Sequence, residues 1–162
     1  DGILPQLFAT TIYLVVQICQ IEKTVFGSIF KIQIETGELE NTHPNTAEIT
    51  LTAADGEKVS LRGSSIGGGN ILITRVNGME VALTGQNPAL IVLHKDAPGT
   101  IAAVTELMAE YGVNICNFHL ARETKGGLAV MTIESDSHFV PELNEKINRL
   151  ENIYSSTMLE RV

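Results

Sequence analysis

The feature that most constrains the fold is a change in hydrophobic period near residue 87. Before this point, short runs rich in β-branched residues alternate with turn residues. After it, a continuous apolar run at 89–94 is followed by apolar residues at helical spacing. Because a period of two indicates strands and a period near 3.6 indicates helices, the chain predicts a β-rich half followed by a mixed half.

The mixed half predicts two helices among four strands. After a turn at 95–99, the first helix is indicated by apolar residues three and four positions apart: Ile101, Val104, Met108 and Tyr111. Gly112 ends this helix, as glycine commonly does. Pro141 suits the first position of the second helix, whose apolar face is Leu143, Ile147 and Leu150. Strands are expected at 89–94, 113–121, 128–134 and 152–160. The order β-α-β-β-α-β in about 75 residues predicts an α+β, ferredoxin-like fold.

The β-rich half predicts an antiparallel sheet built on two hairpins, with one earlier alternating run at 30–35. Asp55-Gly56 and Asn77-Gly78 favour two-residue hairpin turns, because both turn positions need positive φ. The runs that flank these dipeptides are 47–53 with 58–63, and 70–76 with 79–84. We therefore expect two domains, a β-rich one over 1–86 and a mixed one over 87–162.

Both predicted domains are acidic. The 162 residues include 11 Lys and Arg against 19 Asp and Glu, a net charge of −8. Residues 1–86 hold 5 basic and 9 acidic side chains, and 87–162 hold 6 and 10. Each part therefore has a net charge of −4, and neither is basic. Nucleic-acid binding needs a basic surface and often stacking aromatics, which make up only 5% of this chain. Composition therefore excludes a nucleic-acid partner.

Cysteine and histidine content argues against a metal site in this chain. Cys19 and Cys116 lie 97 positions apart, too few thiols for a disulfide scaffold or a four-thiolate zinc site. The four histidines, at 43, 94, 119 and 138, show no metal-ligand spacing. We expect reduced thiols in a cytoplasmic protein. Residues 2–21 carry no charge, but their glutamines and β-branched residues favour a buried strand or core helix over a membrane span.

Two stretches of the β-rich half carry candidate site residues. One is the glycine-rich cluster Gly63-Ser64-Ser65-Ile66-Gly67-Gly68-Gly69. Successive glycines can turn backbone N–H groups inward to form an anion nest, and they can equally form a wide turn or bulge between strands. The cluster lacks the features of a Walker or a Rossmann loop. The other stretch, His43-Pro44-Asn45-Thr46, is also consistent with an ordinary entry into a strand.

A third candidate site follows the strand at 89–94. Pro98-Gly99 opens the first helix, whose N–H groups and positive dipole end favour a small carboxylate. His94 and Asp96 suit the amino group of a ligand. Asn114, at the start of the next strand, can hydrogen-bond to both the amino group and the carboxylate. The alternative is a helix-capping turn that binds no ligand.

These residues make 87–162 resemble an ACT domain, the amino-acid-sensing module of many biosynthetic and degradative enzymes. His94, Asp96 and Pro98-Gly99, with Asn114 inside Gly112-Val113-Asn114-Ile115, occupy positions that hold the ligand in serine-sensing members. Asp96 departs from the pattern, because an amide is common at its position. The resemblance implies an effector site for a small amino acid at His94, Asp96, Pro98, Gly99 and Asn114.

The β-rich half adds a second and more specific resemblance. His43-Pro44-Asn45-Thr46, a hairpin and the glycine-rich cluster resemble the β subunit of iron–sulfur-dependent bacterial L-serine dehydratase, in which a serine-binding-type β domain precedes an ACT domain. The resemblance spans 41–162; residues 1–40 lack the Ser-Ser-Ser-His-Thr and Gly-His-Gly-Thr stretches that the family carries upstream. The implied substrate-domain residues are His43, Asn45, Thr46, Ser64, Ser65, Gly67, Gly68 and Gly69.

This resemblance implies a non-cluster beta subunit or segment of a lyase that converts L-serine to pyruvate and ammonia. A cluster with an open iron needs at least three thiolates. The 4Fe–4S cluster is therefore expected on a partner alpha chain, and this chain alone is expected to be inactive and to hold no catalytic residue. The alternative is a regulatory amino-acid-binding module of another enzyme, such as a phosphoglycerate dehydrogenase. We also expect self-association through strand 113–121, which lies at a sheet edge in this fold. Pairing of two such edges would bring Asn114 of one copy towards His94 and Asp96 of the other, with a small amino acid bound between the copies.

Overall fold

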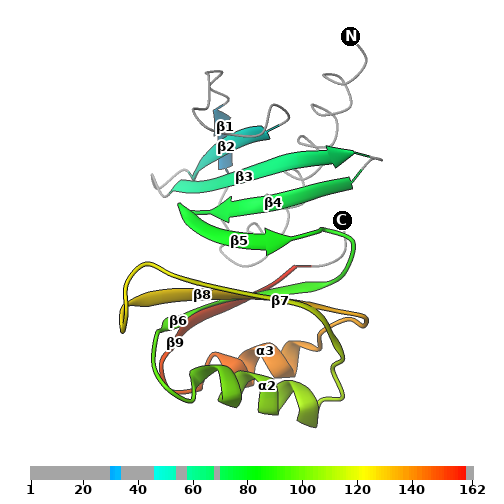
Figure 1. Cartoon of the computed structure of the whole chain (residues 1–162), viewed down its shortest axis with the longest axis vertical. Coiled ribbons are helices and arrows are strands. Elements are labelled where there is room, and N and C mark those ends of the chain that lie inside the picture. The colour runs from blue at the N-terminus through cyan, green and yellow to red at the C-terminus, as the bar shows by residue number, and fades with distance from the viewer. Residues whose placement is uncertain (1–29, 34–45, 54–57, 68–69, 160–162) are drawn as a thin grey trace. The chain divides into compact units, whose positions relative to one another are not determined.

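The computed structural model describes residues 30–33, 46–53, 58–67 and 70–159 (Figure 1). The chain forms two compact units, Asp1–Gly78 with Val162, and Met79–Arg161. The uncharged stretch 2–21 and Cys19 lie outside the described residues. Within the described ranges, no helix is long and apolar enough to cross a membrane.

The described part of the first unit is an antiparallel sheet with strand order β1-β2-β3-β4. Its strands are β1 (Phe30–Gln33), β2 (Thr46–Ala53), β3 (Lys58–Gly67) and β4 (Asn70–Val76). The predicted pairing of the runs around Asp55-Gly56 is confirmed, although this dipeptide itself lies outside the described residues. β3 does not end at Gly63 as expected. It continues to Gly67, since β4 stays paired with it through register shifts after Arg62 and after Ser65.

The dipeptide Asn77-Gly78 forms the turn that its sequence predicts. Asn77 has φ 50° and Gly78 has φ 80°, the left-handed conformation that a type I′ turn requires at both positions. Asn77 also bonds to Ser60: its N–H donates to the Ser60 carbonyl at 2.8 Å, and its Oδ1 accepts from the Ser60 N–H at 2.9 Å. The chain then enters β5 (Met79–Leu83), the next strand in the same order.

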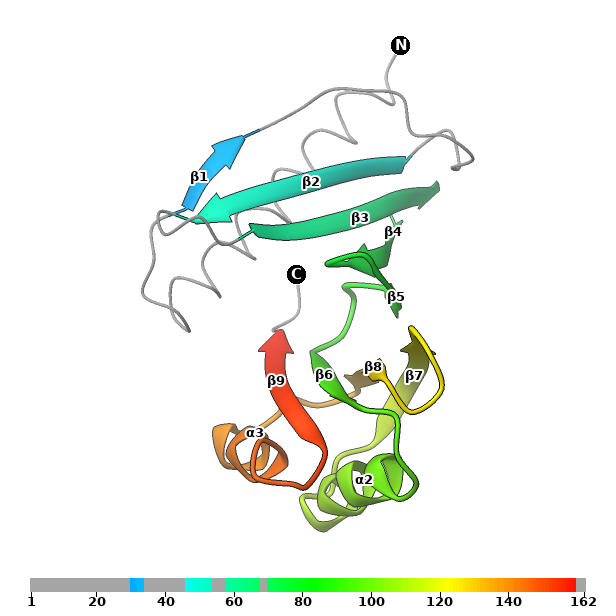
Figure 2. The ribbon, with the colours of Figure 1, turned by 90° about the vertical axis from the view of Figure 1, so that its left-hand side faces the viewer.

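The second unit confirms the predicted α+β, ferredoxin-like fold. Its strand order is β7-β8-β6-β9, with antiparallel neighbours, and both helices cover one face of this sheet (Figure 2). Two bounds differ from expectation by more than one residue: the strand expected from Val113 begins at Ile115, and the second helix ends at Ile147 although its apolar pattern extends to Leu150. The elements after β5 are β6 (Ala89–Lys95), α2 (Thr100–Glu110), β7 (Ile115–Arg122), β8 (Leu128–Ser135), α3 (Pro141–Ile147) and β9 (Ile153–Leu159).

The core of the second unit lies between its sheet and the two helices. Its buried residues are Leu90, Val92, Val104, Met108, Met131, Ile133, Phe139, Leu143 and Ile147. Four positions assigned to the core from helical spacing, Val104, Met108, Leu143 and Ile147, are at most 1% exposed. Ile101, assigned to the same face of the first helix, is 38% exposed. The apolar stripe of α2 is therefore wider than the face that the sheet covers.

β5 packs against β7 and β8, so the two compact units divide before it, between Gly78 and Met79. The domain boundary expected between residues 86 and 87 stays a prediction. Just after β5, Thr84 donates two hydrogen bonds of 2.8 Å to the Glu134 carboxylate, from its N–H and from its hydroxyl. The Asn117 amide donates a third, also of 2.8 Å. These bonds satisfy a carboxylate that is only 1% exposed and attach the segment after β5 to β8.

Candidate functional site

Four of the five residues predicted to bind an effector lie at the end of β6 and in the loop that joins it to α2. Gly99 is the N-cap of α2 and has φ 86°, whereas a Cβ added there meets nothing within 4 Å. Glycine is thus required by the backbone conformation and not by a lack of space. α2 has no side-chain cap and no acidic residue in its first turn, so its own side chains leave the positive helix end uncompensated. Pro98 lies exposed beside it.

His94 is buried at the end of β6, with 2% of its surface exposed. The period of two places it on the helix-covered face with Leu90 and Val92. Its Nδ1 lies 2.8 Å from the Lys95 carbonyl oxygen. Because that oxygen only accepts, Nδ1 donates this hydrogen bond. Nε2 has no hydrogen-bond partner in the described part of the chain, and neither has the buried Oγ1 of Thr100, in the first turn of α2.

Asp96 is held by the turn between β7 and β8. Its Oδ2 accepts hydrogen bonds of 2.9 Å from the Arg122 guanidinium and from the Gly126 N–H. Its own N–H donates to the Gly127 carbonyl at 2.8 Å. The Gly126 N–H and then Arg122 hold the pKa of the Asp96 carboxyl below its ordinary value of 3.8. Asp96 is therefore a fixed carboxylate at neutral pH.

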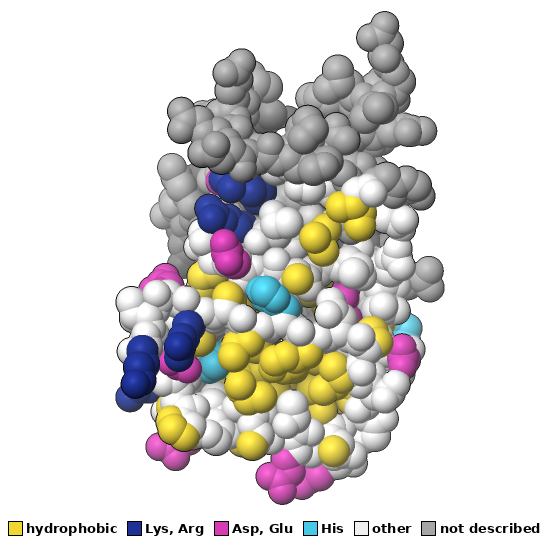
Figure 3. Space-filling view, viewed as in Figure 1, with side chains coloured by type: hydrophobic (Ala, Val, Ile, Leu, Met, Phe, Trp, Pro, Cys, Tyr) yellow, Lys and Arg dark blue, Asp and Glu magenta, His cyan; other side chains and the backbone are white. Residues whose placement is uncertain are grey.

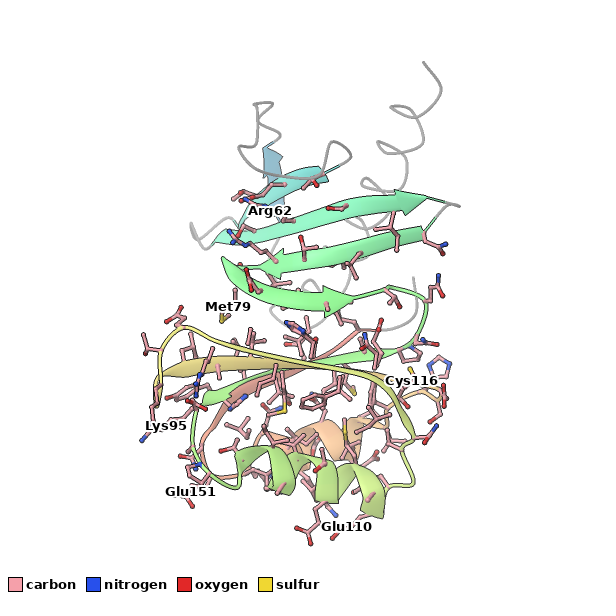
Figure 4. The ribbon with its side chains drawn as sticks, in the orientation of Figure 1. Arg62, Met79, Lys95, Glu110, Cys116 and Glu151 are labelled. Carbon is pink, nitrogen blue, oxygen red and sulfur yellow. The ribbon has the colours of Figure 1, made fainter. Side chains whose placement is uncertain are left out.

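Asn114 does not join the other four residues within one chain. It precedes β7, and its side chain donates a hydrogen bond to the Asp136 carboxylate. Register with β8 places Ile115 opposite Ser135 but His94 opposite Ala129, so the two ends are roughly 20 Å apart at about 3.3 Å per residue. In Figure 4, Lys95 at the end of β6 and Cys116 near the start of β7 lie on opposite sides of the view.

β7 is an edge strand of its sheet, as predicted. Phe118 and Leu120 lie on it opposite the core residues Ile133 and Met131, so their side chains share the helix-covered face. They are nevertheless 38% and 41% exposed, as is Ile101 of α2 at 38%. We call Phe118, Leu120 and Ile101 the edge patch. Figure 3 shows hydrophobic side chains gathered between β7 and α2 on this face of the second unit.

Two of the motif residues of the first unit meet. Thr46 of β2 lies opposite Ser64 of β3, and their hydroxyl oxygens are 2.7 Å apart. The structure thus joins the end of the His43-Pro44-Asn45-Thr46 stretch to the first serine of the glycine-rich cluster. Ser65 and Gly67 lie further along β3, opposite Ile71 and Asn70. The remaining predicted residues, His43, Asn45, Gly68 and Gly69, lie outside the described residues.

Sequence reasoning missed Arg122 and Gly126, which bind the Asp96 carboxylate. Gly126 lies between the predicted strands 113–121 and 128–134, and Arg122 is the residue just after the first of them. Both lie more than twenty positions from Asp96, so only the pairing of β6 and β7 with β8 brings them together. The available signal was the unusual acid at position 96, which calls for a nearby cation or N–H group.

Comparisons with known proteins agree with both resemblances. Residues 89–152 match the family model of the ACT domain. The chain is 43% identical over 117 residues to the probable L-serine dehydratase beta chain of Bacillus subtilis (strain 168), a match that covers 72% of this chain and 53% of that protein. It is 26% identical over 121 residues to the L-serine dehydratase beta chain of Peptoniphilus asaccharolyticus, covering 75% of this chain and 54% of that protein.

A third relative is a dehydrogenase and not a dehydratase. The chain is 34% identical over 121 residues to a D-3-phosphoglycerate dehydrogenase of Methanocaldococcus jannaschii, covering 74% of this chain and 22% of that protein. The chain spans about half the length of the two serine dehydratase relatives. Residues 89–152 therefore match the ACT-domain family, and over about three quarters of its length the chain is similar to the beta chains of L-serine dehydratase.

Proposed function

We propose that this chain is the non-cluster beta subunit, or beta segment, of a cytoplasmic L-serine ammonia-lyase that converts L-serine to pyruvate and ammonia. The observation that carries the proposal is the 43% identity to a protein named as such a beta chain. That match of 117 residues is longer than the ACT region 89–152, so the similarity also includes sequence outside the ACT domain.

The iron–sulfur cluster is assigned to a partner alpha chain. A cluster that leaves one iron open needs at least three thiolates. This chain has two cysteines, of which Cys116 lies exposed on β7 and Cys19 lies outside the described residues. Two thiols do not fit a cluster, so this chain contributes binding and assembly and no catalytic residue.

In this proposal, the ACT domain binds a small amino acid, L-serine or a close relative, as its effector. His94 Nε2 and Thr100 Oγ1 are buried without partners at the α2 end of the sheet, and buried polar atoms normally have partners, which supports a ligand there. The positive start of α2 suits the ligand carboxylate, and Asp96 suits its ammonium group.

In this proposal, a second copy of the chain contributes Asn114, the fifth residue of the site. Asn114 lies at the opposite end of β8 from His94 within one chain, so it can join the site only from another copy. β7 offers an unpaired edge among the described strands and carries the exposed edge patch. Two such edges related by a two-fold axis extend the sheet and bring each Asn114 towards the partner's α2 end.

The alternative function is a regulatory module of a phosphoglycerate dehydrogenase. The 34% identity to the Methanocaldococcus jannaschii protein favours it, at a lower identity than the dehydratase match. Both functions place an amino acid on the ACT domain, so ligand binding alone does not separate them.

Anaerobic co-purification tests the proposal. The tagged chain, isolated anaerobically from its own cells, is expected to retain a cysteine-rich, brown, oxygen-sensitive chain and to turn L-serine into pyruvate. The chain produced alone is expected to hold no stoichiometric iron or sulfide and to be inactive. Retention of a nicotinamide-dependent dehydrogenase would establish the alternative, and a stable cluster on the lone chain would overturn both.

A further inference from the structure

The ion pair between Asp96 and Arg122 joins the effector loop to the end of the edge strand. Arg122 is the last residue of β7, and its Nη1 lies 2.9 Å from Asp96 Oδ2. The Arg122 side chain is 55% exposed and that of Asp96 is 25% exposed, so the guanidinium lies on the solvent side of the carboxylate. The Asp96 carboxylate, which is proposed to bind the ligand's ammonium group, thus already binds the Arg122 guanidinium of the same chain.

We propose that Arg122 determines the specificity of this site, restricting it to zwitterionic amino acids. The inference rests on the proposed effector function and names the chemistry that the site accepts. The ligand ammonium takes a place on Asp96, and the Arg122 guanidinium, in addition to the positive start of α2, binds the ligand carboxylate. The internal ion pair is thereby exchanged for two ion pairs with the ligand.

Charge balance supports this exchange. Asp96 and Arg122 together are neutral, so a ligand with only an ammonium group leaves one uncompensated positive charge beside the guanidinium. A ligand with only a carboxylate leaves one uncompensated negative charge beside Asp96. A zwitterion leaves the site neutral and gives each protein charge an opposite partner. The five N–H donors of the guanidinium, in a planar fork, suit a carboxylate, and the exposed side chain has room to turn.

Gly126 keeps the carboxylate in place during the exchange. Its N–H donates to the same Oδ2 at 2.9 Å, and the Asp96 N–H is bound to the Gly127 carbonyl. Both bonds come from the backbone of the β7–β8 turn and persist when Arg122 moves. Asp96 is therefore fixed by the turn, and Arg122 is the only one of these partners that is a movable side chain.

Calorimetric titration of the full chain at neutral pH tests this inference with three probes. L-Serine carries both charges, ethanolamine lacks the carboxylate, and glycerate lacks the ammonium group. The wild-type chain is expected to bind L-serine at least ten-fold more tightly than either analogue. Arg122→Gln is expected to lower the affinity for L-serine about ten-fold. Ethanolamine is expected to bind this variant equally or more tightly, because its ammonium group no longer meets the guanidinium.

Two further variants complete the test. Arg149→Gln removes an equal charge from a side chain that is 79% exposed and 3.8 Å from Glu145, and is expected to change neither affinity. Arg122→Lys keeps the charge but not the fork, and is expected to retain a preference for L-serine. If Arg122→Gln does not fold, Asp96→Asn/Arg122→Gln replaces it and should show no preference for the zwitterion. A preference for L-serine that is unchanged in Arg122→Gln overturns this inference alone, whereas a wild-type chain that binds no L-serine overturns the effector function as well.

Discussion

The amide of Asn117 donates a hydrogen bond of 2.8 Å to the buried carboxylate of Glu134, at the point where β7 shifts its register against β8. On the same carboxylate, Thr84 adds its N–H and its hydroxyl. Three donors from two distant segments thus converge on one side chain of the sheet. The Glu134 carboxylate therefore helps to attach the end of β5 to the four-stranded sheet of the second unit.

Glu134→Ala is expected to lower the free energy of unfolding by about 2–4 kcal/mol. Removing the acceptor leaves up to three donors unpaired, and an unpaired buried donor costs about 1–3 kcal/mol. Glu134→Gln keeps one acceptor oxygen and is expected to lose about half as much. Urea unfolding monitored by circular dichroism measures both values. A loss below about 0.5 kcal/mol for the alanine variant would show that water replaces the carboxylate at little cost.

The ion pair at Asp96 predicts a dependence of stability on pH. The Gly126 N–H and Arg122 lower the pKa of the folded carboxyl below 3.8. A group whose pKa is lower in the folded state stabilises the fold above its unfolded pKa, and this contribution is lost as pH falls through the folded pKa. The stability difference between the wild type and Asp96→Asn should therefore be constant from about pH 8 to pH 5 and shrink below about pH 4.

Unfolding midpoints of the two proteins across this pH range provide the measurement. Arg149→Gln serves as the control, because it removes a charge without touching Asp96. A difference that persists unchanged at pH 3 would mean that Asp96 is not ionised and paired in the folded chain.

Most of the second unit follows from local pattern. The spacing of Val104 with Met108, and of Leu143 with Ile147, predicts the buried faces of both helices, because a side chain's direction repeats every 3.6 residues. Asn77-Gly78 likewise predicts its own turn, because few residues tolerate positive φ. The continuation of β3 to Gly67 was missed, because it depends on bulged pairing with β4 and not on the composition of β3.

The candidate site was predicted only in part. His94, Asp96 and Gly99 lie within six consecutive residues, so the sequence places them together. The partners Arg122 and Gly126 come from another hairpin, and the order of strands in the sheet decides that contact. The position of Asn114 at the opposite end of β8 also follows from register, which short-range spacing does not encode.

Gly99→Ala is expected to destabilise the second unit by about 1–2 kcal/mol through its left-handed backbone. The added methyl group meets nothing within 4 Å, so the loss comes from φ and not from a clash. Gly99→Asn is the matched control and should cost less, because asparagine tolerates this conformation. Thermal unfolding of the three proteins tests the order. Equal losses for alanine and asparagine would indicate that the cost arises outside the backbone conformation of residue 99.

The edge patch predicts that the chain pairs through β7. Leu120→Asp places a charge on the helix-covered face of the edge strand, where the side chain is 41% exposed in the single chain. In a paired sheet this charge is buried or repelled by its symmetry mate, so the variant is expected to be monomeric at concentrations where the wild type is a dimer. Analytical ultracentrifugation at several concentrations measures the change.

Tyr154→Asp is the matched control for this substitution. Tyr154 is 62% exposed on β9, the opposite edge of the same sheet, so its replacement changes charge and apolar area without touching β7. It should leave the dimer intact, whereas Leu120→Asp should also abolish the rise in melting temperature that L-serine gives the wild type, because Asn114 then no longer reaches the partner's α2 end. A monomeric Leu120→Asp chain that still gains stability from L-serine would show that one copy binds the ligand without Asn114 of another.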